Sequence, residues 1–76
     1  MIIQQVTPKE GFVLYIVAEN GKSGEFDVSP YLEAEAFQQL KNPEEFKKIH
    51  NGKYFIAWEC GADFSADTIE AHLKLG

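Results

Sequence analysis

Two segments of the chain are apolar at nearly every position, so as strands they would carry hydrophobic side chains on both faces. The first is FVLYIVA, residues 12–18, whose two faces are Phe12, Leu14, Ile16 and Ala18, and Val13, Tyr15 and Val17. The second is YFIAW, residues 54–58, whose faces are Tyr54, Ile56 and Trp58, and Phe55 and Ala57. A strand with one solvated face would instead alternate with polar residues. Both segments therefore predict central strands that need cover on two sides.

Shorter strands and two tight turns surround these segments. IIQQV (residues 2–6) is read as the first strand, joined to the second by TPKEG, and GEFDV (residues 24–28) as the third, with Glu25 and Asp27 on its solvated face. Asn20-Gly21 and Asn51-Gly52 are hairpin signals, because a type I′ turn requires positive φ at both central positions. The pattern predicts antiparallel hairpins around residues 12–18 and 54–58.

Helix signals occur between these hairpins and after the second. A short turn is expected at Ser29-Pro30, followed by a helix over residues 36–48. Within it, NPEE restarts the helix with Asn42 as N-cap, Pro43 at the first position and a glutamate that reaches back to the cap.

The closing helix is predicted over residues 66–73, directly after the last strand. Ser65 is its expected N-cap, with Asp63 as the rival, and Phe64 packs on Ile69 as a hydrophobic staple. Gly61 is expected at a sharp strand-to-helix turn that requires positive φ.

These elements predict a single α+β domain over residues 1–76. The expected architecture is one antiparallel sheet of four or five strands, built from hairpins, with two or three short helices packed on it. Local connections throughout favour hairpins over parallel crossovers.

Charge and cysteine content narrow the function classes. The net charge is −5, with a pI near 4.8, which disfavours nucleic-acid binding and favours a basic protein partner. The single cysteine cannot form an internal disulfide, and we find no signal peptide or apolar run that would span a bilayer. We therefore expect a cytoplasmic protein that binds no membrane.

Candidate chemistry is sparse. Cys60 with His50 or His72 would be a nucleophile and base, but nothing orients the imidazole and no oxyanion-loop signature accompanies it. Cys60, Asp63 and the histidines lack the paired spacing of a metal site. We expect no enzyme activity, no catalytic or metal-binding residues and no cofactor.

The frame DVSPYL, LKNPEEFKKI, WxxGADF and DTI resembles a small bacterial family catalogued as domain of unknown function 2442. The resemblance runs over nearly the whole chain. It departs from the family at Ala66, where proline is frequent, and at Glu59-Cys60, where Pro-Asn is common, so Cys60 is no family nucleophile. Genes of this type often adjoin another small family, which implies a toxin-antitoxin-like pairing. Longer members continue into a helix-turn-helix segment, for which the sequence up to Gly76 has no counterpart.

Two functions follow from these observations. The first is a protein-interaction module, antitoxin-like or regulatory, that forms a homo-oligomer or binds a small protein partner. Its predicted partner-binding residues are Val13, Tyr15, Val17, Phe55, Trp58 and Asp63. Self-association covers the second apolar sheet face in this prediction, unless loops and residues 29–40 bury it within one chain. The alternative is a small-ligand-binding domain or minor enzyme with a pocket near the corner formed by residues 58–67.

Overall fold

The structure is a computed structural model that describes residues 1–75. Its strands are β1 (Ile3–Lys9), β2 (Val13–Ala18), β3 (Ser23–Asp27), β4 (Ile49–Asn51), β5 (Phe55–Trp58), β6 (Asp63–Ser65) and β7 (Lys74–Leu75). Its helices are the 3-10 helices η1 (Ser29–Tyr31) and η2 (Glu35–Lys41) and the α-helices α1 (Pro43–Phe46) and α2 (Ala66–His72). The α+β class is confirmed.

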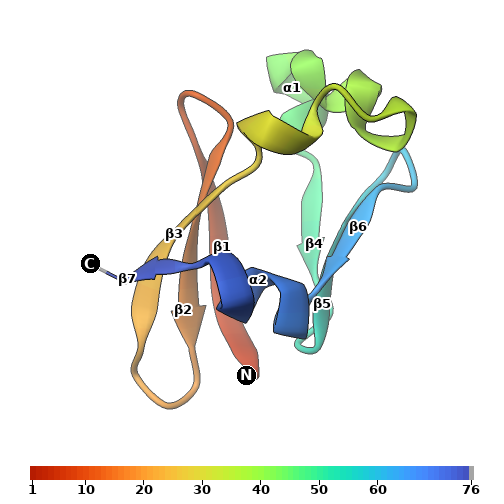
Figure 1. Cartoon of the computed structure of the whole chain (residues 1–76). Coiled ribbons are helices and arrows are strands. Elements are labelled where there is room, and N and C mark those ends of the chain that lie inside the picture. Colours follow the sequence, from red (N-terminus) through yellow and green to blue (C-terminus); the bar gives the residue numbers. More distant parts are fainter. Residues whose placement is uncertain (76) are drawn as a thin grey trace.

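The strands form two antiparallel sheets, so the prediction of one sheet is wrong. Sheet A has the order β1-β2-β3-β7, in which β7 contributes only two residues, and sheet B has the order β4-β5-β6. The two sheets stand opposite each other, with η1, η2 and α1 across one end and α2 across the other (Figure 1). They meet where the Ile3 N–H donates to the Lys53 carbonyl at 2.7 Å and the Asn51 side-chain amide donates to the Ile3 carbonyl at 2.9 Å.

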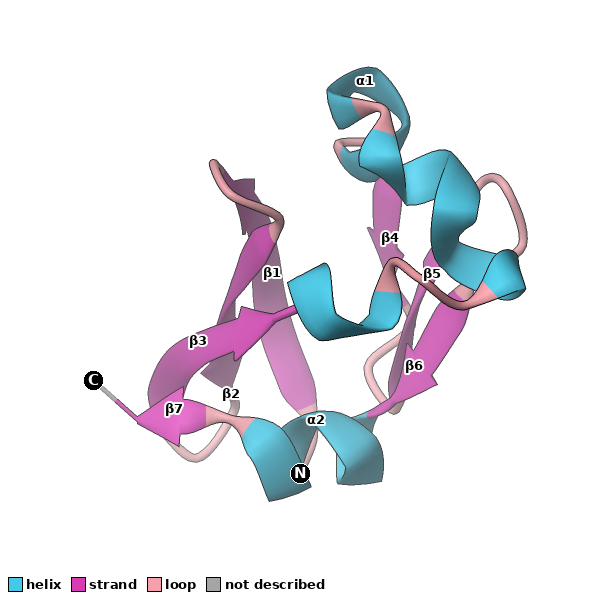
Figure 2. Cartoon of the chain, turned by 45° about the horizontal axis from the view of Figure 1, so that its top comes forward, coloured by secondary structure: helices cyan, strands magenta, loops and turns pink. Residues whose placement is uncertain are grey.

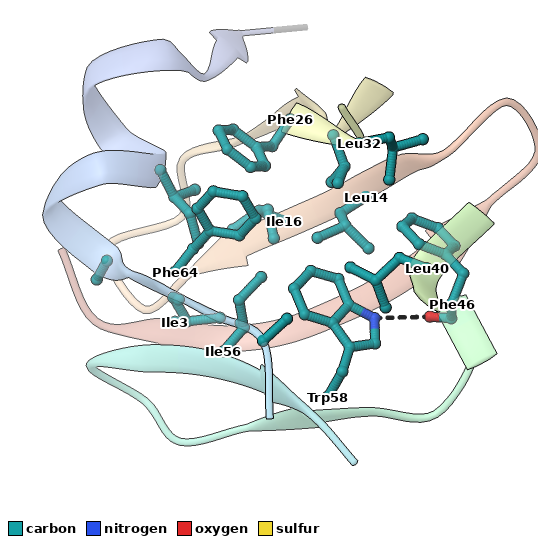
Figure 3. Close-up of a cluster of buried hydrophobic side chains, with 14 residues drawn as sticks. Ile3, Leu14, Ile16, Phe26, Leu32, Leu40, Phe46, Ile56, Trp58 and Phe64 are labelled. Carbon is teal, nitrogen blue, oxygen red and sulfur yellow. Dashed lines mark hydrogen bonds between the residues drawn. The ribbon is translucent and has the colours of Figure 1, made fainter. Parts of the chain in front are cut away.

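The core lies between the sheets, because each central strand turns one apolar face inward. Leu14, Ile16, Ile56 and Trp58 are all buried. The helical segments close the open ends of this core with further side chains, namely Leu32, Leu40 and Phe46 (Figure 3) at one end and Ile69 of α2 at the other. Each sheet therefore covers one face of the other, and a single chain needs no second layer of helices.

Phe64 is the centre of an aromatic cluster within this core. Its ring centroid lies 5.1 Å from that of Phe26, 5.0 Å from Tyr31, 4.8 Å from Phe37 and 6.0 Å from Trp58. These contacts join β3, η1, η2 and sheet B around one side chain. The short strand β6 that carries Phe64 is thereby fixed against both sheets.

The first predicted hairpin turn exists, but it is not a type I′ turn. Of Asn20 and Gly21, only Gly21 has positive φ, at 89°. The Gly21 N–H donates to the Ala18 carbonyl at 3.0 Å, and the Ala18 N–H donates to the Lys22 carbonyl at 2.8 Å. These bonds are typical of a three-residue loop that ends in a left-handed glycine.

The same loop recurs at Trp58–Ala62, which corrects the prediction for Gly61. Gly61 has φ of 99°, its N–H donates to the Trp58 carbonyl at 2.9 Å, and the Trp58 N–H donates to the Ala62 carbonyl at 2.9 Å. Positive φ was expected, but the turn joins two strands rather than a strand and a helix. The intervening strand β6 was absent from the prediction.

The hairpin at Asn51-Gly52 places its left-handed residue one position later than expected. Lys53 has φ of 73°, while Gly52 does not have positive φ. The Asn51 side-chain oxygen accepts the Lys53 N–H at 2.8 Å, an asparagine-centred turn that fixes the backbone. β5 consequently begins at Phe55, and Tyr54 belongs to the loop.

The predicted helix over residues 36–48 is two separate elements. Glu35–Lys41 is a 3-10 helix, and Asn42 is extended, with φ of −80° and ψ of 117°, before the single α-helical turn of α1. Pro43 disfavours helical backbone at the preceding residue, which explains the break. The Asn42 cap is confirmed, because its side chain accepts the Glu44 N–H at 3.0 Å. Glu45 contacts the Lys48 ammonium at 3.3 Å rather than the cap.

The closing helix begins as predicted. Ser65 is its N-cap, and the Ser65 hydroxyl oxygen accepts the Thr68 N–H at 3.2 Å. Phe64 and Ile69, the predicted staple pair, are both buried. Asp63 lies in β6 and is exposed, so it is not the cap.

We expect Ser65→Ala to lower the free energy of unfolding by about 1 kcal/mol, because the Thr68 N–H loses its acceptor. Ser65→Asp should be tolerated, since its carboxylate can accept the same bond and complements the helix dipole. Urea denaturation measures both values. A costly Asp63→Ala together with a silent Ser65→Ala would contradict this assignment.

Candidate functional site

The structure separates the six predicted partner-binding residues into three locations. Val13, Tyr15 and Val17 lie on the outer face of sheet A, Phe55 and Asp63 lie on the outer face of sheet B, and Trp58 lies between the sheets. They do not form one surface. The two outer faces must be considered separately.

The outer face of sheet A is less apolar than the sequence of β2 indicates. Val13, Tyr15 and Val17 are half-buried, and their cross-strand partners are polar. These partners are Lys9, Thr7 and Gln5 on β1, and Asp27, Glu25 and Ser23 on β3. The Lys9 ammonium lies over the Tyr15 ring, 5.4 Å from its centroid. Neighbouring strands therefore supply part of the cover that the prediction assigned to self-association.

Asp27 is the last residue of β3 and borders the outer face of sheet A. Its carboxylate accepts hydrogen bonds from the Ser29 hydroxyl and, at 3.0 Å, from the Ser29 N–H. The Ser29 hydroxyl bond, followed by the backbone bond, lowers the pKa of Asp27 below its usual value. A lowered folded-state pKa stabilises the native chain above the unfolded value of about 3.9, and this stabilisation is lost as the pH falls through the folded value.

Trp58 is a core residue and is not accessible to a partner. Its side chain is only 3% exposed, and its indole N–H donates to the Phe46 carbonyl at 2.8 Å (Figure 3). This bond joins sheet B to α1. Inclusion of Trp58 among the surface residues is corrected accordingly.

The most exposed aromatic side chains in residues 1–75 lie where the β4–β5 loop enters β5, and of the two only Phe55 belongs to the outer face of sheet B. Tyr54 is 66% exposed and Phe55 is 47% exposed. Tyr54 was predicted to share a face with Ile56 and Trp58, but it precedes β5 and is exposed, whereas Ile56 and Trp58 are buried. Phe55 pairs across the sheet with Ser65, and Asp63 is exposed on the same face opposite Ala57.

The Phe55 ring lies against Gly52. The ring lies so close to the Gly52 Cα that a Cβ at this position would overlap its atoms. Gly52 does not have positive φ, so a side chain at this position would displace the exposed Phe55 ring rather than strain the backbone. We call Tyr54 and Phe55 the aromatic pair.

A cavity of about 600 Å³ lies at the other end of the molecule, between the β1–β2 turn and α1. Its walls include Pro8, Glu10, Phe12, Pro43, Phe46 and Lys47. The sequence analysis missed it, because its two walls are about thirty residues apart and neither carries a motif. Near residues 58–67, where the alternative prediction placed a pocket, Trp58, Ala62, Phe64 and Ala66 are all buried.

The remaining titratable candidates are dispersed. His50 and His72 are both exposed, and Cys60 is half-buried and free. Among residues 1–75, no three histidine, cysteine or acidic side chains gather to hold a metal ion. None of the described helices has the length and apolar character to cross a membrane.

Comparison with known proteins identifies the family and nothing finer. The model of the family described as "Protein of unknown function (DUF2442)" matches residues 3–74. Neither a curated protein nor a solved structure matches the chain. The match spans both sheets and α2, and it agrees with the resemblance found in the sequence. The chain therefore belongs to the DUF2442 family of proteins of unknown function.

Proposed function

We propose that this chain is a cytoplasmic protein-interaction module that binds a small protein partner through the outer face of sheet B. The single observation that carries the proposal is the aromatic pair, exposed at 66% and 47% beside the edge strand β6. Aromatic residues are enriched among the residues that dominate binding energy at interfaces. An antitoxin-like or regulatory subunit is one form of such a module.

The geometry of this face supports a binding role. Phe55 pairs with Ser65 in sheet B, so the backbone that carries the exposed ring is already ordered before a partner covers it. Polar residues border the pair, including Ser65 and Asp63. An apolar centre within a polar border is the usual anatomy of an interface.

Charge indicates the kind of partner. The chain has a net charge of −5, and Asp63 adds an exposed carboxylate to this face. A partner with a basic surface would associate faster and more selectively than a neutral one. A second copy of the chain would bring the same negative charge, which makes it the less favoured occupant.

Sedimentation equilibrium at high micromolar concentration tests which surface associates. If a second copy is the occupant, the wild-type chain should be a dimer, and Phe55→Ser should yield the mass of one chain. Val17→Ser on sheet A is the matched control and should not change the mass. A dimer that survives Phe55→Ser and dissociates with Tyr15→Lys would place the interface on sheet A. If the wild-type chain instead sediments with the mass of one chain, a different protein, and not a second copy, is the partner that covers this face.

A further inference from the structure

We propose that the cavity between the β1–β2 turn and α1 binds a small organic anion with an aromatic or aliphatic body. The cavity measures about 600 Å³, within the range of about 300 to 1,000 Å³ that is usual for small-molecule sites. The β1–β2 turn and α1, which line it, lie at the opposite end of the molecule from the β4–β5 hairpin that carries the aromatic pair (Figures 1 and 2). The ligand site and the proposed protein interface can therefore be tested separately.

Apolar groups make up the walls of the cavity. Pro8 and Phe12 come from the β1–β2 hairpin, and Pro43 and Phe46 come from α1. The Phe12 and Phe46 rings meet edge to face, with centroids 5.4 Å apart and planes at 83°. Such a lining suits a hydrocarbon or aromatic ring and offers no side-chain hydrogen bonds to it.

The wall on the hairpin side is held in a costly conformation. Phe12 has φ of 62°, directly after Gly11 at 77°, and a bulky residue rarely adopts left-handed backbone. The contact with Phe46 and a 2.9 Å hydrogen bond from the Val28 N–H to the Phe12 carbonyl oppose this strain. The Phe12 ring is thus fixed against α1, and the cavity exists before any ligand binds.

The charged side chains at the cavity favour a ligand with a negative charge. Lys9, Lys47 and Glu10 line it, giving a local charge of +1 on a chain of −5. Lys9 is already held over the Tyr15 ring, which leaves the exposed Lys47 ammonium as the main partner for an anion. A carboxylate beside Lys47, with its apolar body between Phe12 and Pro43, satisfies both parts of the site.

The test uses three probes that share one tail: 4-phenylbutyrate, 4-phenylbutanol and 4-phenylbutylamine. Amide and indole chemical shifts of the ¹⁵N-labelled full chain are followed during each titration. The single Trp58 indole N–H is a sensitive reporter, because it donates to the Phe46 carbonyl at 2.8 Å. We expect the acid to bind with Kd at or below about 1 mM, ahead of the alcohol and then the amine. Shifts should concentrate at Gly11, Phe12 and Lys47.

Lysine variants provide the controls. Lys47→Gln should weaken phenylbutyrate about two- to fivefold and leave phenylbutanol unchanged. Lys9→Gln should have a smaller effect, and the remote Lys53→Gln should have none. Equal or tighter binding of the amine, shifts confined to Tyr54 and Phe55, absence of saturable shifts, or equal effects of all three variants would each overturn the proposal. Loss of partner binding through the aromatic pair would not affect it.

Discussion

Phe64→Ala should remove a large part of the stability of this chain. Phe64 is the residue on which Phe26, Tyr31, Phe37 and Trp58 converge, with ring centroids 4.8 to 6.0 Å away. Truncation of a buried phenylalanine costs about 3 to 5 kcal/mol, because burial is lost and a void remains. Domains of this size have only about 4 to 11 kcal/mol in total. Urea denaturation followed by circular dichroism measures the loss.

Phe64→Leu is the matched control for this prediction. Leucine keeps much of the apolar volume but none of the ring contacts, so its cost should lie well below that of alanine. A Phe64→Ala variant whose urea midpoint equals that of the wild type would show that the two sheets do not close over this side chain.

Trp58→Phe should cost about 2 to 3 kcal/mol, although it is the most conservative change available at this position. The variant loses the indole N–H that donates to the Phe46 carbonyl, so a buried acceptor is left unpaired at about 1 to 3 kcal/mol. The smaller ring also leaves a void beside Phe46 and Phe64. Differential scanning calorimetry measures the resulting fall in melting temperature and in the free energy of unfolding.

The same variant separates a core role from a binding role for Trp58. Folded Trp58→Phe protein should retain its partner as well as the wild type, because the indole does not reach the surface. A variant of unchanged thermal stability that fails to bind would contradict its placement between the sheets.

Local signals were predicted well, because their physics lies within a few residues. Asn42 and Ser65 were identified as caps from residue type and position, and both accept the expected backbone N–H. Gly61 was expected at positive φ and has φ of 99°. These features require no knowledge of what packs against them.

The arrangement of the sheets could not be predicted in the same way. An apolar strand face indicates that something covers it, but not whether the cover is a helix, a second sheet or another chain. In this fold the inner faces of β2 and β5 cover each other, which the pattern of residues 12–18 and 54–58 allowed but did not specify. Strand β6 has only three residues, which is too short for an alternation of apolar and polar side chains to be recognised in the sequence.

The site was predicted only in part for a related reason. Phe55 and Asp63 are exposed, while Trp58 occupies the inner face. Lys53 adopts left-handed backbone, which no sequence rule favours for lysine, so β5 begins at Phe55 and Tyr54 lies before it. The cavity depends on packing between the residue 8–12 hairpin and the residue 43–47 helix, which appears only in three dimensions.

The most direct test of the proposed function is co-purification of the chain with the products of its native neighbouring genes. The wild-type chain should retain one small protein in a fixed stoichiometric ratio. Phe55→Ser should lose that protein, while Val17→Ser, on the opposite sheet, should keep it. A wild-type chain that purifies alone and sediments as a single chain, or a complex that Phe55→Ser leaves intact, would contradict the assignment of this face as the interface.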